Sequence, residues 1–112
     1  MKNRIHIVLI GCLFLLSGGP IAGIAAEPPE LREAVAEGRI VPLSSILDWL
    51  DSRYRGQVVE VELEVRDGEL VYEIDLLGPS GQRVEFLFDA SNGDLRGVRG
   101  VNVGEMRRRD GP

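Results

Sequence analysis

Apolar and polar residues alternate with a period of two over residues 58–76, a pattern typical of β-strands that bury one face. Asp67-Gly68 interrupts the alternation, and this dipeptide is a strong signal for a two-residue hairpin turn. A turn at this point places apolar residues opposite one another on one face of the hairpin. The expected pairs are Val65 with Leu70, Leu63 with Tyr72, Val61 with Ile74 and Val59 with Leu76.

A third strand is predicted after the turn signal Pro79-Ser80-Gly81, because a turn at this point again places apolar residues opposite apolar residues. Asn92-Gly93 then predicts a further turn, which can lead into a short final strand through Val98. The pattern therefore predicts a three-stranded antiparallel β-meander with one apolar face. The expected pairs between its second and third strands are Leu76 with Val84, Ile74 with Phe86 and Tyr72 with Phe88.

Two helices are predicted before the meander, at residues 30–37 and 43–55. The second has a continuous apolar face, and Gly56 supplies its end. That face is the expected cover for the meander, so the predicted fold class is α+β, with N-terminal helices packed on one face of the three-stranded sheet. Trp49 lies beside the apolar face. Packing near Leu31 and Val35 is the favoured interpretation, and an exposed anchor for a partner is the alternative.

Residues 1–26 have the three parts of a secretory signal peptide: a positive start, an apolar run and small residues at the end. We expect cleavage after Ala26 or Ala25, export to the periplasm and no stable membrane anchor afterwards. An uncleaved anchor and lipidation at Cys12 are the minor alternatives. The expected organisation is a signal peptide at 1–26, a lead-in with a short helix at 27–39, one domain at 40–98 and a flexible tail at 99–112.

The composition excludes several function classes. The 112 residues carry 13 Lys+Arg against 18 Asp+Glu, and a net charge of −5 argues against a nucleic-acid binder. His6 and Cys12, the only His and the only Cys, both lie in the predicted signal peptide. A mature chain without them lacks the residues for a Ser-His-Asp or Cys-His centre and for a zinc or copper site. Residues 89–94 lack the spacing of a calcium loop. We therefore expect no enzyme activity, no catalytic residues, no cofactor and no metal.

A short sequence motif resembles that of a known protein family. The segment Val71-Tyr72-Glu73-Ile74-Asp75, followed after a turn by residues 84–95, resembles the end of a PepSY domain. Asn92 stands where that family usually has Thr, and the resemblance covers about residues 40–98. It implies a helix and antiparallel sheet, no catalytic residues, and a role like that of the inhibitory or chaperoning propeptides of secreted metallopeptidases. Small exported PepSY proteins of Gram-negative bacteria are similar in their lead-in segment.

The solvent side of the predicted meander is acidic. The register places Glu60, Asp75 and Glu85 in one row and Glu62 and Glu73 in the next, which we call the acidic face. Glu64 and Glu69 lie nearby, and we expect no basic residue between the carboxylates of the first row. A solvated, solubilising face is the favoured interpretation, and a docking surface for a basic partner or for cations is the alternative.

These observations together lead to a functional hypothesis. We expect a non-enzymatic periplasmic PepSY module that binds and modulates a protein partner, with inhibition as the expected effect. The partner would be a protease or the periplasmic domain of a sensor kinase. A cation-binding or cationic-ligand-binding protein that uses the acidic face is the alternative. The candidate partner-binding residues are those of the acidic face together with Trp49.

Overall fold

The structure is a computed structural model that describes residues 7–9 and 29–109. Both predicted helices are present, the first shifted by one residue and the second ending two residues earlier than expected. The second helix ends at Arg53 because Tyr54 adopts extended backbone angles and forms a β-bridge with Arg107. In chain order the elements are β1 (Ile7–Leu9), α1 (Pro29–Ala36), α2 (Leu43–Arg53), β2 (Gln57–Arg66), β3 (Glu69–Leu77), β4 (Arg83–Asp89), β5 (Leu95–Arg99) and α3 (Val103–Met106).

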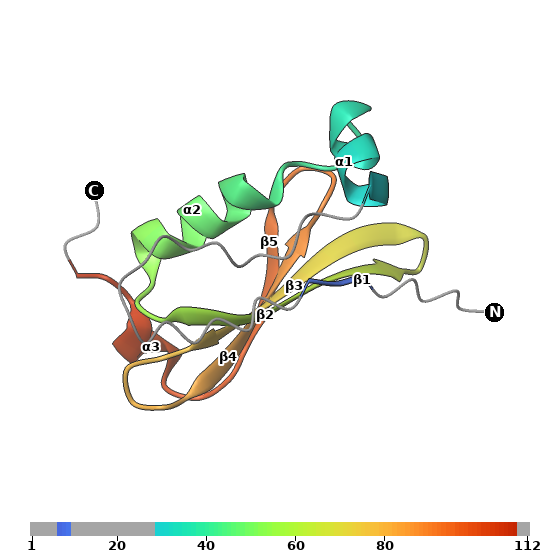
Figure 1. The fold of residues 1–112 in the computed structure, drawn as a ribbon. Helices are drawn as coiled ribbons and strands as arrows, with labels where there is room; N and C mark the ends of the chain where they lie inside the picture. Colours follow the sequence, from blue (N-terminus) through green and yellow to red (C-terminus); the bar gives the residue numbers. More distant parts are fainter. Residues whose placement is uncertain (1–6, 10–28, 110–112) are drawn as a thin grey trace.

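The strands form one antiparallel sheet in the order β1-β2-β3-β4-β5 (Figure 1). All but one of the predicted apolar pairs are confirmed, including the three pairs between β3 and β4. The pair of Val59 with Leu76 is wrong. Leu76 lies opposite Val58, because the register shifts between Val58 and Glu60 and leaves Val59 as the extra residue. Such an irregularity bends a strand and increases its twist.

The fold class α+β is confirmed, but the number of strands is higher than the three predicted. Strand β5 extends the meander to four strands, and β1 pairs with the outer edge of β2. Strand β1 lies within the segment predicted as a signal peptide. The rest of that prediction, including the cleavage site and Cys12, falls outside the described residues. Among the described residues, no helix is long and apolar enough to span a membrane.

Helix α2 lies across one face of the sheet, and the core fills the space between them (Figure 1). Its largest members, Tyr72, Phe86 and Phe88, are at most 1% exposed. The Tyr72 hydroxyl donates a hydrogen bond to the Val41 carbonyl oxygen at 3.2 Å, so the buried phenol has a partner. Helix α1 adds Leu31 to the same core. The opposite face of the sheet is left uncovered by these helices and carries the acidic residues of β2, β3 and β4.

The C-terminal segment contributes to the core, which the sequence did not indicate. Met106, in α3, is 0% exposed. The Arg55 N–H donates to the Met106 carbonyl oxygen at 2.6 Å, and the Arg108 N–H donates to the Arg53 carbonyl oxygen at 2.8 Å. These bonds attach the segment to the end of α2. The expectation of a loose tail with little to bury is therefore wrong at Met106, because a single buried residue leaves no periodic signal.

Candidate functional site

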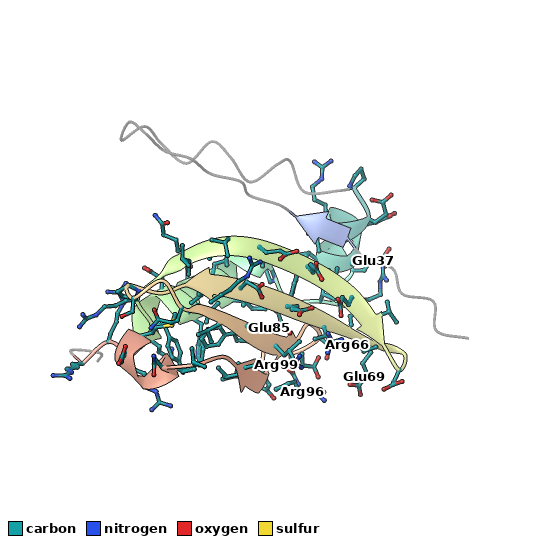
Figure 2. All side chains as sticks on the ribbon, turned by 90° about the horizontal axis from the view of Figure 1, so that it is seen from below. Glu37, Arg66, Glu69, Glu85, Arg96 and Arg99 are labelled. Atoms are coloured by element: carbon teal, nitrogen blue, oxygen red, sulfur yellow. The ribbon has the colours of Figure 1, made fainter. Side chains whose placement is uncertain are left out.

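The acidic face lies on the side of the sheet opposite α2 (Figure 2). The predicted rows are confirmed: Glu60 pairs with Asp75, Asp75 with Glu85, and Glu62 with Glu73. The carboxylates are close enough to interact strongly. One oxygen from each member lies within 4.8 Å of the others in two overlapping groups, which are Glu62, Glu64 and Glu73, and Glu73, Asp75 and Glu85.

Arg66 and Arg83 form ion pairs on this face and Arg99 stands opposite Glu85, so the expectation that no basic residue lies between the carboxylates is wrong. The guanidinium of Arg83 lies 2.7 Å from Glu60 Oε2 and 2.9 Å from Asp75 Oδ2. Arg83 stands opposite Leu77, two residues from Asp75, so its long side chain reaches Asp75 along the diagonal of the sheet. The predicted register could have indicated the contact between Arg83 and Asp75, since diagonal neighbours lie within reach of long side chains.

The second arginine lies at the other end of the face. Arg66, just before the hairpin turn, places its Nε 2.7 Å from Glu64 Oε2 and its Nη2 3.4 Å from Glu73 Oε2. Burial raises the pKa of Glu64, but hydrogen bonds from Arg66 and from neighbouring carboxyl groups outweigh it and lower the pKa overall. Arg66 and Arg83 therefore partly compensate the acidic face from its two ends, and Arg66 reaches as far as Glu73.

At the centre, two carboxyl groups hold a proton near neutral pH. Hydrogen bonding to Glu60, together with burial, raises the pKa of Glu62 to about 7. Burial, followed by hydrogen bonding to and repulsion from Glu85, raises the pKa of Glu73 to about 8. Two carboxyl groups can share a hydrogen bond only when one of them is protonated. The centre can therefore bind or release protons at neutral pH, and it offers acceptor oxygens to a cation or to cationic side chains.

Trp49 packs on the core by one side of its ring and is partly exposed on the other. Its ring meets Phe88 edge-on with centroids 5.6 Å apart, and the centroid of Tyr54 lies 6.3 Å away. The Arg53 guanidinium lies over the ring, 4.3 Å from its centroid. Packing of Trp49 against the core is confirmed, with Phe88 and Tyr54 as its ring neighbours, whereas packing near Leu31 and Val35 stays a prediction. Trp49 is on the α2 side of the sheet, so the structure does not bring it together with the acidic face.

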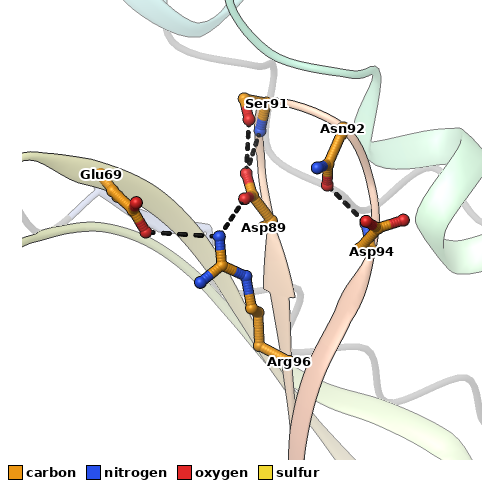
Figure 3. Close-up of polar contacts among 6 residues, drawn as sticks. All are labelled: Glu69, Asp89, Ser91, Asn92, Asp94 and Arg96. Atoms are coloured by element: carbon orange, nitrogen blue, oxygen red, sulfur yellow. Dashed lines mark hydrogen bonds and ion pairs between the residues drawn. The ribbon is translucent and has the colours of Figure 1, made fainter.

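Asp89, at the end of β4, is surrounded by hydrogen-bond donors, in contrast to Glu62 and Glu73 (Figure 3). Its Oδ1 accepts hydrogen bonds from the Ser91 N–H at 2.8 Å and the Ser91 hydroxyl at 2.6 Å, and its Oδ2 accepts one from Arg96. These bonds, from Ser91 first and then Arg96, lower the pKa of Asp89 to about 2. In the same turn the Asp94 N–H donates to Asn92 Oδ1 at 2.9 Å. Both Asp89 oxygens are used to hold the turn between β4 and β5.

Comparison with known proteins gives one match. A family model described as "Peptidase propeptide and YPEB domain" (PepSY) matches residues 40–99, which is more than half of the chain. The matched range contains α2 and the strands β2 to β5, and therefore the whole acidic face. No curated protein and no solved structure matches.

Proposed function

The chain belongs to the PepSY family, and from this membership we propose that it is a regulatory module that binds a protein partner through the acidic face. The family description names peptidase propeptides, which suggests a non-catalytic, propeptide-like module. Inhibition of the partner is the mode that this description favours. A protease or the periplasmic domain of a sensor kinase is the partner class that fits an exported PepSY protein.

The crowded centre of the acidic face is the observation that supports docking. Like charges placed opposite each other weaken a sheet, and a face needed only for solubility could spread its carboxylates. Here Glu73 belongs to two close groups of carboxylates, one with Glu62 and one with Glu85, and arginines compensate them only in part. A basic partner would replace the shared protons with charge-assisted hydrogen bonds, which are about twice as strong as neutral ones. The partner would thereby relieve the repulsion between the carboxylates.

Docking can be tested with a pair of charge-matched variants. The face variant is Glu62→Gln with Glu73→Gln, and the control is Glu30→Gln with Glu33→Gln on the exposed side of α1. Each immobilised protein is exposed to periplasmic extract, and a protein captured by wild type is identified, purified and measured by surface plasmon resonance. We expect the face variant to bind more weakly, because it cannot form the charge-assisted hydrogen bonds, and the control to bind like wild type.

The salt dependence and the partner's activity complete this test. The wild-type affinity should fall as salt rises, because surface charges are screened. The partner's activity should change when it is bound. Equal binding by the face variant and wild type at every salt concentration would contradict docking through this face.

The cation-binding alternative is separated from docking by calorimetry. Wild type is titrated with Ca²⁺ and with Mg²⁺, whose preferred ligands are oxygens. We expect no saturable heat. Saturable heat that disappears in the face variant but persists in the α1 control would favour a cation-binding protein instead.

The location of the protein is proposed from the signal-peptide pattern at residues 1–26 alone. We propose that the mature chain begins at Glu27 or Ala26 and acts in the periplasm. Intact-mass measurement of the exported form checks this proposal. A retained Met1, or a lipid on Cys12, would contradict it.

A further inference from the structure

A groove with a volume of about 470 Å³ lies at the C-terminal end of α2. We call it the basic groove and define it by Trp49, Arg53, Tyr54, Arg107, Arg108 and Arg109. It combines four guanidinium groups with two aromatic rings. In a chain whose net charge is −5, this collection of four of the 13 basic residues is a strong local reversal of charge.

The fold builds this groove from segments that are far apart in the sequence. Tyr54 leaves α2 and forms a β-bridge with Arg107, and burial of Met106 fixes the segment that carries the arginines. The Arg108 N–H donates to the Arg53 carbonyl oxygen, which holds the two segments side by side. Backbone contacts therefore place the three consecutive arginines beside Trp49 and Tyr54.

The positive charge of the groove is only partly compensated. Arg108 donates from Nε to the Asp51 carbonyl oxygen at 2.6 Å and from Nη2 to Asp51 Oδ1 at 3.2 Å. Arg53 stacks on Trp49 and uses one donor on the Ser52 hydroxyl, at 3.1 Å. Within the part of the chain that the structure describes, only one of the four arginines forms an ion pair, and this pair joins Arg108 to Asp51. All four arginines are exposed.

We propose that the basic groove binds an acidic peptide segment of a partner protein. Arginine pairs with carboxylates through two parallel hydrogen bonds, so Arg107 and Arg109 would hold acidic side chains of the peptide. Trp49, which is partly exposed, would contact an apolar side chain of the peptide, as aromatic residues commonly do at interfaces.

A peptide fits better than an extended polyanion. The groove has the volume of a pocket for a small ligand or a few side chains. A long nucleic acid or polyphosphate would be repelled by the negative charge of the rest of the molecule. The basic groove and the acidic face lie on opposite sides of the sheet, so the two surfaces can be tested separately. This inference does not depend on docking through the acidic face.

The experiment uses the fact that Trp49 is the single Trp of the chain. The full chain is titrated at low salt with a dye-labelled heptapeptide of six glutamates around a central phenylalanine. The fluorescence anisotropy of the labelled peptide detects binding. In a second titration with unlabelled peptide, a change in Trp49 fluorescence shows that the groove is involved. We expect saturable binding that Arg107→Ala with Arg109→Ala weakens by about tenfold or more, the loss expected for charge-assisted contacts. Circular dichroism confirms that each variant is folded.

The matched control is Arg32→Ala with Arg39→Ala, which removes the same charge from exposed sites outside the groove. This control should bind within about twofold of wild type, because distant surface charges act weakly. Equal loss in the two double variants would overturn the proposal, and so would an absence of saturable binding by wild type. Equal binding of a heptapeptide with glutamine in place of glutamate would exclude recognition of carboxylates.

Two further outcomes would assign another occupant. Inorganic phosphate that displaces the peptide completely at equal concentration would indicate a phosphate site. Sedimentation that shows self-association of wild type, lost in the Arg107 and Arg109 variant, would indicate that a second copy of the chain occupies the groove. Either result would overturn the acidic-peptide proposal.

Discussion

Asp89 and Glu73 belong to neighbouring strands of one sheet, and their environments have opposite effects. Their side chains are comparably sheltered, at 9% and 16% exposed. Hydrogen bonds from Ser91 and Arg96 lower the pKa of Asp89 to about 2, whereas burial and the adjacent Glu85 raise the pKa of Glu73 to about 8. The difference shows that burial raises the pKa of a carboxylate on this sheet, and that the carboxylate is held as an anion where close hydrogen-bond donors outweigh burial.

The two regions therefore make stability depend on pH in opposite directions. The pKa of Asp89 is lower in the folded chain than its ordinary 3.8, so its stabilisation is present above that pH and is lost as pH falls toward 2. The pKa of Glu73 is raised above its ordinary 4.5, so its contribution is present below pH 4.5 and is lost as pH rises through about 8. We expect the fold to be most stable in mildly acidic solution.

The largest expected effect tests the register on which this comparison depends. Ile74 is 0% exposed and lies between Val61 and Phe86 on the buried face. Ile74→Ala should reduce the free energy of unfolding in urea by about 2–5 kcal/mol, the range for truncation of a core isoleucine. The neighbouring Glu73→Ala should not destabilise the fold at pH 8. Equal losses for the two variants would mean that the faces are assigned wrongly.

The arrangement of the sheet was predictable because alternation and turn residues give the same answer. A slip of one residue would move every apolar side chain to the solvent face, so Asp67-Gly68 and the flanking alternation leave one register. The prediction failed at Val59, where an irregularity adds a residue to one strand. It also did not include β1, because that strand lies in the segment predicted to be a signal peptide.

The acidic face was predictable in position but not in charge balance. The rows of the acidic face followed directly from the register. The contribution of Arg83 and Arg66 did not, because their long side chains cross the sheet from the ends of the strands. The basic groove was missed for a different reason. Three consecutive arginines in a tail resemble a solvated charged segment, and only the tertiary bridge between Tyr54 and Arg107 brings them to Trp49.

The next effect in size concerns the turn after β4. Asp89→Asn removes the negative charge and leaves one acceptor oxygen for donors that now use two. We expect a lower unfolding temperature than wild type at pH 7 and a much smaller difference at pH 2, where the wild-type carboxylate is becoming protonated. Asp94→Asn, an exposed site in the same turn, is the control and should change the unfolding temperature little at either pH. An equal loss at both pH values would assign the effect to shape instead of charge.

The smallest effect concerns the centre of the acidic face and has the opposite sign. Glu73→Gln keeps the size of the side chain and removes the charge that forms as pH rises from 5 to 8. The variant should match wild type at pH 5 and be more stable at pH 8, by on the order of 1 kcal/mol, since each unit of pKa shift corresponds to about 1.4 kcal/mol and the group is partly exposed to water. Urea unfolding measures both values, with Glu33→Gln on α1 as the control.

Partner binding should show the reverse dependence on pH, and this links the stability of the sheet to the proposed function. A cationic surface binds the ionised form of Glu62 and Glu73, so docking at neutral pH must release their protons. The affinity of wild type should therefore rise between pH 6 and 8 while the stability of the free protein falls. In the Glu62→Gln, Glu73→Gln variant, neither the affinity nor the stability should depend on pH in this way. A wild-type affinity that falls over this range would contradict docking through the acidic face. If the partner binds Glu62 and Glu73 as anions, its affinity must rise with pH while the stability of the free protein falls.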